Sequence, residues 1–333
     1  MKTLTLKTWG IWSLLFASAC GPPALPWPAA PLLEAGQPAL LEDESRAEIL
    51  KRIAGHYAHF DVVAYEEPMQ GAPMRTFIIS YGFTDFRIEG DQLIEEDRFC
   101  HAEHRINRAG MQSSLSDIAT QAITPPSKAV TVRQEDGTWH IHRPPTPSLI
   151  GIAGDPTKPL PTDRKKAQFT DPDQDGKPGM TVKIRVNRFI SGEVYLARRE
   201  IFENHMVLMA DGSIHGTVVD RSEQLVAGAS SRLFDSQANP KQVPDPGLNP
   251  IRLIPIPATL TSCEALMARR AEWAPPAPEF LPQKGDLEDR PTSGLPYSRR
   301  TGSQFSQVGF STVSSSSMLL IQSTKLVPSS LTV

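Results

Sequence analysis

Short alternations of apolar and polar residues, separated by tight turns, fill most of the chain from residue 55 to residue 256. The clearest covers residues 182–186 (Val-Lys-Ile-Arg-Val), which has the period of a strand with one buried face. Asp-Gly pairs at 136–137 and 211–212 each separate two such stretches, and this pair is typical of two-residue β-hairpins. The other predicted strands lie at 56–65, 75–83, 86–89, 93–101, 130–132, 139–142, 193–200, 201–209, 213–220, 223–227 and 251–256.

Many short strands with tight turns favour an antiparallel sheet that closes into a barrel or folds into a sandwich. The sequence therefore predicts a mainly β domain over residues 41–270. A short helix within 42–54 is expected before the first strand, with Asp43 or Ser45 as its N-cap.

Two regions lack the strand pattern. Residues 143–170 are rich in proline and are predicted to form loops. Residues 271–333 are first Pro-rich and then Ser/Thr-rich with few charges, a composition that predicts a disordered tail.

The first 19 residues have the pattern of a cleavable secretory signal. Lys2 and Lys7 precede an apolar run at 9–16, which is too short to span a bilayer. Residues 17–20 (Ala-Ser-Ala-Cys) resemble the lipobox of bacterial lipoproteins, although the family usually has Leu where Ala17 stands. The alternative is an ordinary signal peptide that is cut before Cys20 and leaves a free thiol there.

The lipobox resemblance implies that Cys20 carries a lipid that anchors the chain to a membrane. In Gram-negative lipoproteins an Asp after the Cys usually retains the protein at the inner membrane. Gly21 stands there instead, so the resemblance implies the cell outer membrane, on its periplasmic or surface face. Residues 20–40 then form a Pro/Ala-rich tether.

Charge and motifs narrow the classes of function. The net charge is −3, so the chain lacks the excess of basic residues that is typical of nucleic-acid-binding proteins. It carries no nucleophile elbow, phosphate-binding loop or dinucleotide fingerprint, and we expect no enzyme. His140 and His142 share one strand face, but no HExxH or paired CxxC accompanies them, so they are interpreted as solvated histidines.

Cys100 and Cys263 remain once Cys20 is lipidated. An even pair in an oxidising compartment predicts a disulfide. The alternative is two buried free thiols.

Residues 171–179 (DPDQDGKPG) form the one motif with clear chemistry. Asp171, Asp173 and Asp175 are spaced by two and precede a Gly, as in the first half of a calcium loop. Lys177 would add its backbone carbonyl. The EF-hand pattern fails further on, since Val182 stands where a bidentate Glu belongs. We expect structural Ca²⁺ here; the alternative is a solvated turn that binds nothing.

Three segments and a late cysteine carry a wider resemblance. The chain contains the segments DPDQDGKPGMTVKI, SGEVYLARR and SEQLVAGASS, followed by Cys263. Together they resemble a group of uncharacterised secreted lipoproteins of myxobacterial type, over about residues 55–266. The resemblance implies that this region is structured and that the protein is exported, but it implies no reaction. In addition, residues 55–57 (Gly-His-Tyr) resemble the Gly-x-Trp opening of lipocalins, with Tyr in place of Trp, which implies a barrel.

Together these features predict a lipid-anchored envelope protein of binding or structural type with a Ca²⁺-stabilised loop. Its partners would be the membrane, through the lipid, and either an apolar small molecule or an envelope protein. The alternative is a lipocalin-like carrier of an apolar ligand. A third hypothesis is an envelope hydrolase whose site is assembled from distant carboxylates.

Overall fold

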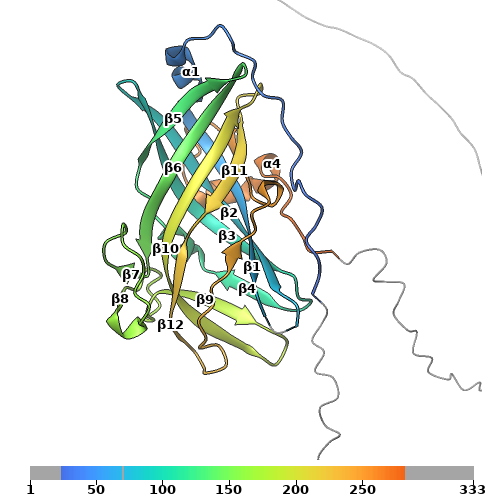
Figure 1. Ribbon diagram of the computed structural model, residues 1–333, viewed down its shortest axis with the longest axis vertical. Helices are drawn as coiled ribbons and strands as arrows, with labels where there is room; N and C mark the ends of the chain where they lie inside the picture. Colours follow the sequence, from blue (N-terminus) through green and yellow to red (C-terminus); the bar gives the residue numbers. More distant parts are fainter. Residues whose placement is uncertain (1–23, 70, 282–333) are drawn as a thin grey trace, which may run out of the picture. The chain divides into compact units, whose positions relative to one another are not determined.

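The computed structural model describes residues 24–69 and 71–281. Its centre is an antiparallel barrel (Figure 1), formed in chain order by β1 (Gly55–Glu67), β2 (Met74–Glu89), β3 (Gln92–Ile106), β5 (Lys128–Glu135), β6 (Thr138–Ile150), β10 (Ser191–Leu208), β11 (Ile214–Asp220) and β14 (Pro250–Pro255). Each of these strands pairs with the next, and β14 pairs back with β1. This order confirms the predicted mainly β, antiparallel fold and selects the barrel over the sandwich.

Helix α1 (Arg46–Ile53) covers one end of the barrel (Figure 1). Its N-cap is Ser45, one of the two predicted residues, which forms a capping box with Glu48. Ile49 and Ile53 are fully buried in a cluster with apolar side chains of β1, β2, β5, β6 and β14. The helix thus fills this end of the barrel with apolar side chains.

At the end of the barrel opposite α1, additional strands take part in the wall. The first part of β10 pairs with β9 (Met180–Arg185) on one side and with β12 (Glu223–Ala229) on the other. β9 in turn pairs with β4 (Gln112–Leu115). The smaller elements are α2 (Asp117–Gln121), β7 (Ile152–Ala153), β8 (Gln168–Phe169), β13 (Lys241–Gln242), α3 (Cys263–Ala268), α4 (Arg270–Trp273) and the 3₁₀ turns η1 (Arg164–Lys166) and η2 (Pro246–Leu248).

The prediction of a loop from residue 143 is wrong for its first part, because β6 continues to Ile150. Thr146 pairs with Phe202, and Arg143 pairs with Asn204, so Pro144 and Pro145 lie in a bulge. This part of β6 also has no β5 partner, since the β5–β6 ladder ends at His142. Proline is tolerated in a strand at such positions because no ladder hydrogen bond is lost there.

The chain segments that precede and follow the barrel in sequence pack against its outer surface. Trp27 contacts Phe77 edge-on, and Phe280 stacks on the same ring. Residues 24–40 and 271–281 therefore lie on the barrel, whereas the sequence predicted a free tether and a disordered tail. Their aromatic side chains bury apolar area, which outweighs the chain entropy that proline-rich composition suggested.

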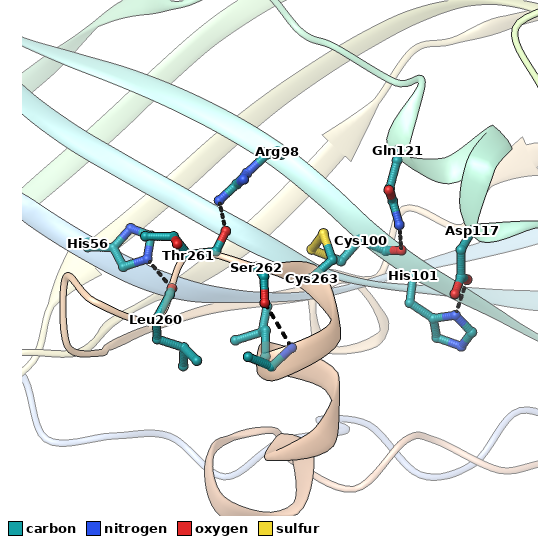
Figure 2. Close-up of a disulfide and its surroundings, with 12 residues drawn as sticks. His56, Arg98, Cys100, His101, Asp117, Gln121, Leu260, Thr261, Ser262 and Cys263 are labelled. Atoms are coloured by element: carbon teal, nitrogen blue, oxygen red, sulfur yellow. Dashed lines mark hydrogen bonds and ion pairs between the residues drawn. A yellow bond between two sulfur atoms is a disulfide. The ribbon is translucent and has the colours of Figure 1, made fainter.

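The predicted disulfide between Cys100 and Cys263 is present and joins β3 to the first residue of α3 (Figure 2). Two hydrogen bonds secure the segment before α3: Arg98 donates to the Thr261 carbonyl at 2.9 Å, and the His56 imidazole contacts the Leu260 carbonyl at 2.9 Å. The bridge therefore fixes the chain that follows the last barrel strand.

Cys20, the predicted signal at 1–19 and the chain after residue 281 lie outside the described residues. Lipid attachment and the outer-membrane location stay predictions. Within residues 24–69 and 71–281, every helix is too short or too polar to cross a membrane.

Candidate functional site

A cavity of about 730 Å³ occupies the half of the barrel away from α1. Alternate residues of β1, from His59 to Glu67, point into it, as expected for one face of a strand. Most of its surface is apolar, and β9 and the segment after β12 supply much of the wall. Representative apolar residues are Met74, Ile78, Val182, Ile184, Leu233 and Phe234.

The inner end of the cavity is polar. His59 lies there, 2 % exposed, between two aspartates. Its Nε2 is 2.7 Å from Asp61 Oδ2, and its Nδ1 is 2.8 Å from Thr84 Oγ1. The Thr84 hydroxyl donates in turn to Asp97 at 2.6 Å. Three neighbouring strands thus bring one imidazole and two carboxylates into a single chain of hydrogen bonds.

Arg143 extends this polar group across the barrel from β6. Its guanidinium lies 3.2 Å from Glu95 Oε1 and 3.5 Å from Asp97 Oδ2. All three side chains are almost completely buried. Arg143 is therefore the counter-charge for carboxylates that the fold has removed from water.

A second charged group lies beside the first, on β10 and β11. Arg198 is within 3.3 Å of Glu200 and 3.7 Å of Asp220. The Tyr65 hydroxyl donates to the same Asp220. Burial and the charge of Asp220 raise the pKa of Tyr65 well above its ordinary value, so the phenol stays protonated as a donor.

Neighbouring charges set the protonation states of His59, Glu95 and Asp97. Burial alone would lower the pKa of His59, but hydrogen bonds and charges of Asp61 and Asp97 outweigh it and raise the pKa to about 10. Burial and the charge of Asp97 raise the pKa of Glu95. Burial would also raise the pKa of Asp97, but the nearby His59, the charge of Arg143 and the hydrogen bond from Thr84 hold it low. At neutral pH His59 is therefore a cation between two carboxylates.

Some buried polar atoms at the inner end have no hydrogen-bond partner among the described residues. They include the acceptors Asp61 Oδ1 and Asn204 Oδ1 and the donors Arg143 Nε and Arg198 Nε, and all four side chains line the cavity. The two Nε atoms lie 3.2 and 3.3 Å from the carboxylates of Glu95 and Glu200. Native proteins rarely leave buried acceptors without a donor, so Asp61 Oδ1 and Asn204 Oδ1 are available to a donor from outside the protein.

The predicted calcium loop connects β8 to β9. One oxygen each from Asp171, Asp173 and Asp175 lies within 4.8 Å of the others. Gly176 has a φ of 81°, which permits the sharp bend. The structure thus brings the three predicted carboxylates together, while Lys177 enters the loop through its backbone N–H, which donates to Asp175.

Backbone groups fix the orientation of these carboxylates. The N–H groups of Asp175 and Gly176 donate to Asp171, and that of Thr181 donates to Asp173 Oδ2. Asp173 is 7 % exposed, and its other oxygen is buried without a hydrogen-bond partner in the described chain. Burial and the neighbouring Asp175 raise the pKa of Asp173, against the bond from Thr181. Asp155 and Asp163, two carboxylates upstream of the loop, accept hydrogen bonds from their own turns.

Sequence reasoning missed the cavity residues. Within the described part of the chain, none of the site residues predicted from the sequence lines the cavity. At its inner end, Glu95 and Asp97 both contact Arg143. The available signal was their spacing of two, which puts both carboxylates on one strand face.

Comparisons with known proteins found no matching family model, no matching curated protein and no matching solved structure.

Proposed function

We propose that the barrel binds a small amphiphilic molecule, with its apolar body along the cavity wall and a hydrogen-bond-donating head at the polar inner end. The observation that carries this proposal is the pairing of an apolar wall with unpartnered buried acceptors, Asp61 Oδ1 and Asn204 Oδ1, in one cavity. A volume of about 730 Å³ is in the range of small-molecule sites. Closed eight-stranded barrels can hold one such ligand.

The ion pairs at the inner end favour a donor head over an anionic one. The Nε atoms of Arg143 and Arg198 lie 3.2 and 3.3 Å from Glu95 and Glu200, so a ligand carboxylate would compete with these partners. A hydroxyl or ammonium group would instead supply the missing donors. Leaving a buried acceptor unpaired costs about 1–3 kcal/mol, and this cost is recovered when the ligand binds.

His59 supports a binding role over general-base catalysis. Both ring nitrogens are engaged, and its two aspartate neighbours keep it protonated. A general base needs a free nitrogen and a pKa near the working pH.

Displacement of a fluorescent apolar probe tests the proposal with three twelve-carbon competitors: an alkylamine, an alcohol and a fatty acid. We expect the amine or the alcohol to displace the probe at least about tenfold better than the acid, because only they supply donors. Asp61→Asn should weaken amine binding at least about tenfold, and Ile184→Trp should weaken all three by filling the cavity.

Asp91→Asn, in the exposed β2–β3 turn, is the matched control and should bind as the wild type does. Melting curves of each variant verify that it is folded. Failure of all three compounds to displace the probe, or equal binding to Asp61→Asn and wild type, would contradict the proposal.

We also propose that Asp171, Asp173 and Asp175 hold a Ca²⁺ ion. Hard carboxylate oxygens are the ligands that Ca²⁺ prefers. Asp173 Oδ1, buried and unpartnered, supports a cation at this place, since a solvated turn would leave that oxygen in water. An ion here would join the loop to the start of β9, because Thr181 bonds to both Asp173 and Asp175.

Calcium at 100 times its dissociation constant is expected to stabilise the fold by about 2.7 kcal/mol, or about 5–10 °C in melting temperature. Asp173→Asn should abolish the shift and the heat of binding in calorimetry. Asp163→Asn, a carboxylate outside the loop, should retain both. A wild-type melting temperature that calcium does not move would reduce the loop to a turn.

A further inference from the structure

A second group of metal-ligand side chains lies on the outer face of the barrel, away from the cavity. His142 on β6 and His205 on β10 are directly opposite each other in the ladder. Their rings are stacked, with centroids 4.8 Å apart. Glu203 lies two residues before His205 and therefore on the same face of β10.

The carboxylate of Glu203 lies between the two imidazoles. Its Oε1 is 3.0 Å from His142 Nε2 and 3.1 Å from His205 Nε2. One ligand atom from each of the three side chains lies within 4.8 Å of the others. Two nitrogens and one oxygen thus lie close enough together to share one ion.

We propose that His142, Glu203 and His205 form a binding site for a divalent transition-metal ion of the zinc class, with at least one coordination position open to solvent. Ligand atoms at about 2.0–2.1 Å from a tetrahedral zinc lie about 3.3 Å from one another. The two distances to Glu203 Oε1 are close to this value, so only small side-chain rotations are needed. Imidazole nitrogens select zinc, copper or nickel over calcium.

The backbone fixes two of these ligands before any metal arrives. His142 and His205 are held in register on neighbouring strands of a closed barrel. Glu203 lies opposite the bulge at Pro144 and Pro145, and bulges commonly redirect side chains next to a site. The site is therefore built on strands and does not depend on a loop.

Arg221 orients the carboxylate. Its guanidinium forms an ion pair with Glu203 Oε2 at 2.8 Å and leaves Oε1 toward the imidazoles. A second group that fixes a ligand in this way is typical of zinc sites.

The site is accessible from solvent, since half of the His205 side chain is exposed (51 %). It faces away from the cavity, because the inward residues next to it are Arg143 and Asn204. The inference is therefore independent of the proposed amphiphile binding, and either can fail without the other.

Calorimetric titration of the untagged full chain with Zn²⁺ tests the site, with excess Ca²⁺ present to occupy the acidic loop. We expect one equivalent to bind. His142→Ala and His205→Ala should each weaken binding by at least about tenfold, as the loss of even a supporting partner does in known sites. His140→Ala is the matched control, because His140 shares the strand and the outer face but contacts Thr138 and Glu135.

Co²⁺ gives a second readout that does not depend on affinity. A tetrahedral site with nitrogen and oxygen ligands should give visible absorption in the wild type and in His140→Ala, but not in the His142→Ala/His205→Ala double variant. Equal Zn²⁺ binding by the wild type and the double variant would overturn the inference. So would Zn²⁺ binding that disappears in Asp173→Asn and not in the histidine variants.

Discussion

Replacing His59 with alanine is expected to lower the free energy of unfolding at pH 7 by about 3–5 kcal/mol, the usual cost of removing one partner from a buried ion pair. His59 is the cation between Asp61 and Asp97, and all three side chains are buried. Without it, Asp61 loses its bond at 2.7 Å and Asp97 loses the cation 3.6 Å away.

The same residue gives the fold a defined dependence on pH. The pKa of His59 is raised from about 6.5 in the unfolded chain to about 10 in the folded one. Its contribution to stability is therefore complete below about pH 6.5. Between pH 6.5 and 10 the unfolded chain binds fewer protons than the folded chain, so stability falls as the pH rises. Above about pH 10 the contribution is gone.

Urea unfolding at several values between pH 8 and 10 measures this slope. The range avoids much of the titration of Glu95, whose raised pKa acts in the same direction at lower pH. We expect the wild type to lose stability across the range, and His59→Ala to lose much less. His140→Ala, with a half-exposed imidazole, is the control and should follow the wild type. A variant as stable as the wild type at pH 7, with the same slope, would show that His59 is not a buried cation.

The strands were predictable wherever the local pattern decides them. The alternation at 182–186 predicted β9, and Asp136-Gly137 predicted the β5–β6 turn, where both residues have positive φ. β1 shows where the alternation of apolar and polar residues fails as a guide. Its outer residues, such as Phe60 and Val62, are as buried as its inner ones, because residues 24–40 and 271–281 cover that face. That cover depends on contacts distant in sequence, so composition alone predicted a free tether and tail instead.

The candidate sites also differ in how far the local sequence predicts them. Asp171, Asp173 and Asp175 come from one short loop, so their spacing alone predicted that they converge. The inner end of the cavity joins His59, Asp97 and Arg143 from three strands, and only the register of the closed barrel brings them together. The contact between His142 and His205 also depends on register, since they are 63 positions apart in sequence (205 − 142) and the ladder makes them neighbours. A shift of one residue would place the two imidazoles on opposite faces.

Removal of the disulfide, by Cys100→Ala together with Cys263→Ala, is expected to lower the free energy of unfolding by about 5 kcal/mol, the value for so long a closed loop in the chain-entropy model. The bridge spans 163 residues. In that model the effect arises in the unfolded chain, which becomes free to expand. The native barrel should persist, because β14 already closes the ring by pairing with β1 and β11.

Urea unfolding of the double variant, beside the wild type with and without a reducing agent, tests both parts of this argument. The midpoint should fall and the dependence on urea should steepen, since an unfolded chain without the cross-link exposes more surface. Reduced wild type should behave as the double variant does, and the variant should not respond to reductant. Loss of the native fold in the double variant would place the effect in the folded state, where the bridge holds α3 against β3. An unchanged midpoint would mean that the contacts of Arg98 and His56 with residues 260–261 suffice to hold this segment, and that the covalent link adds nothing to stability.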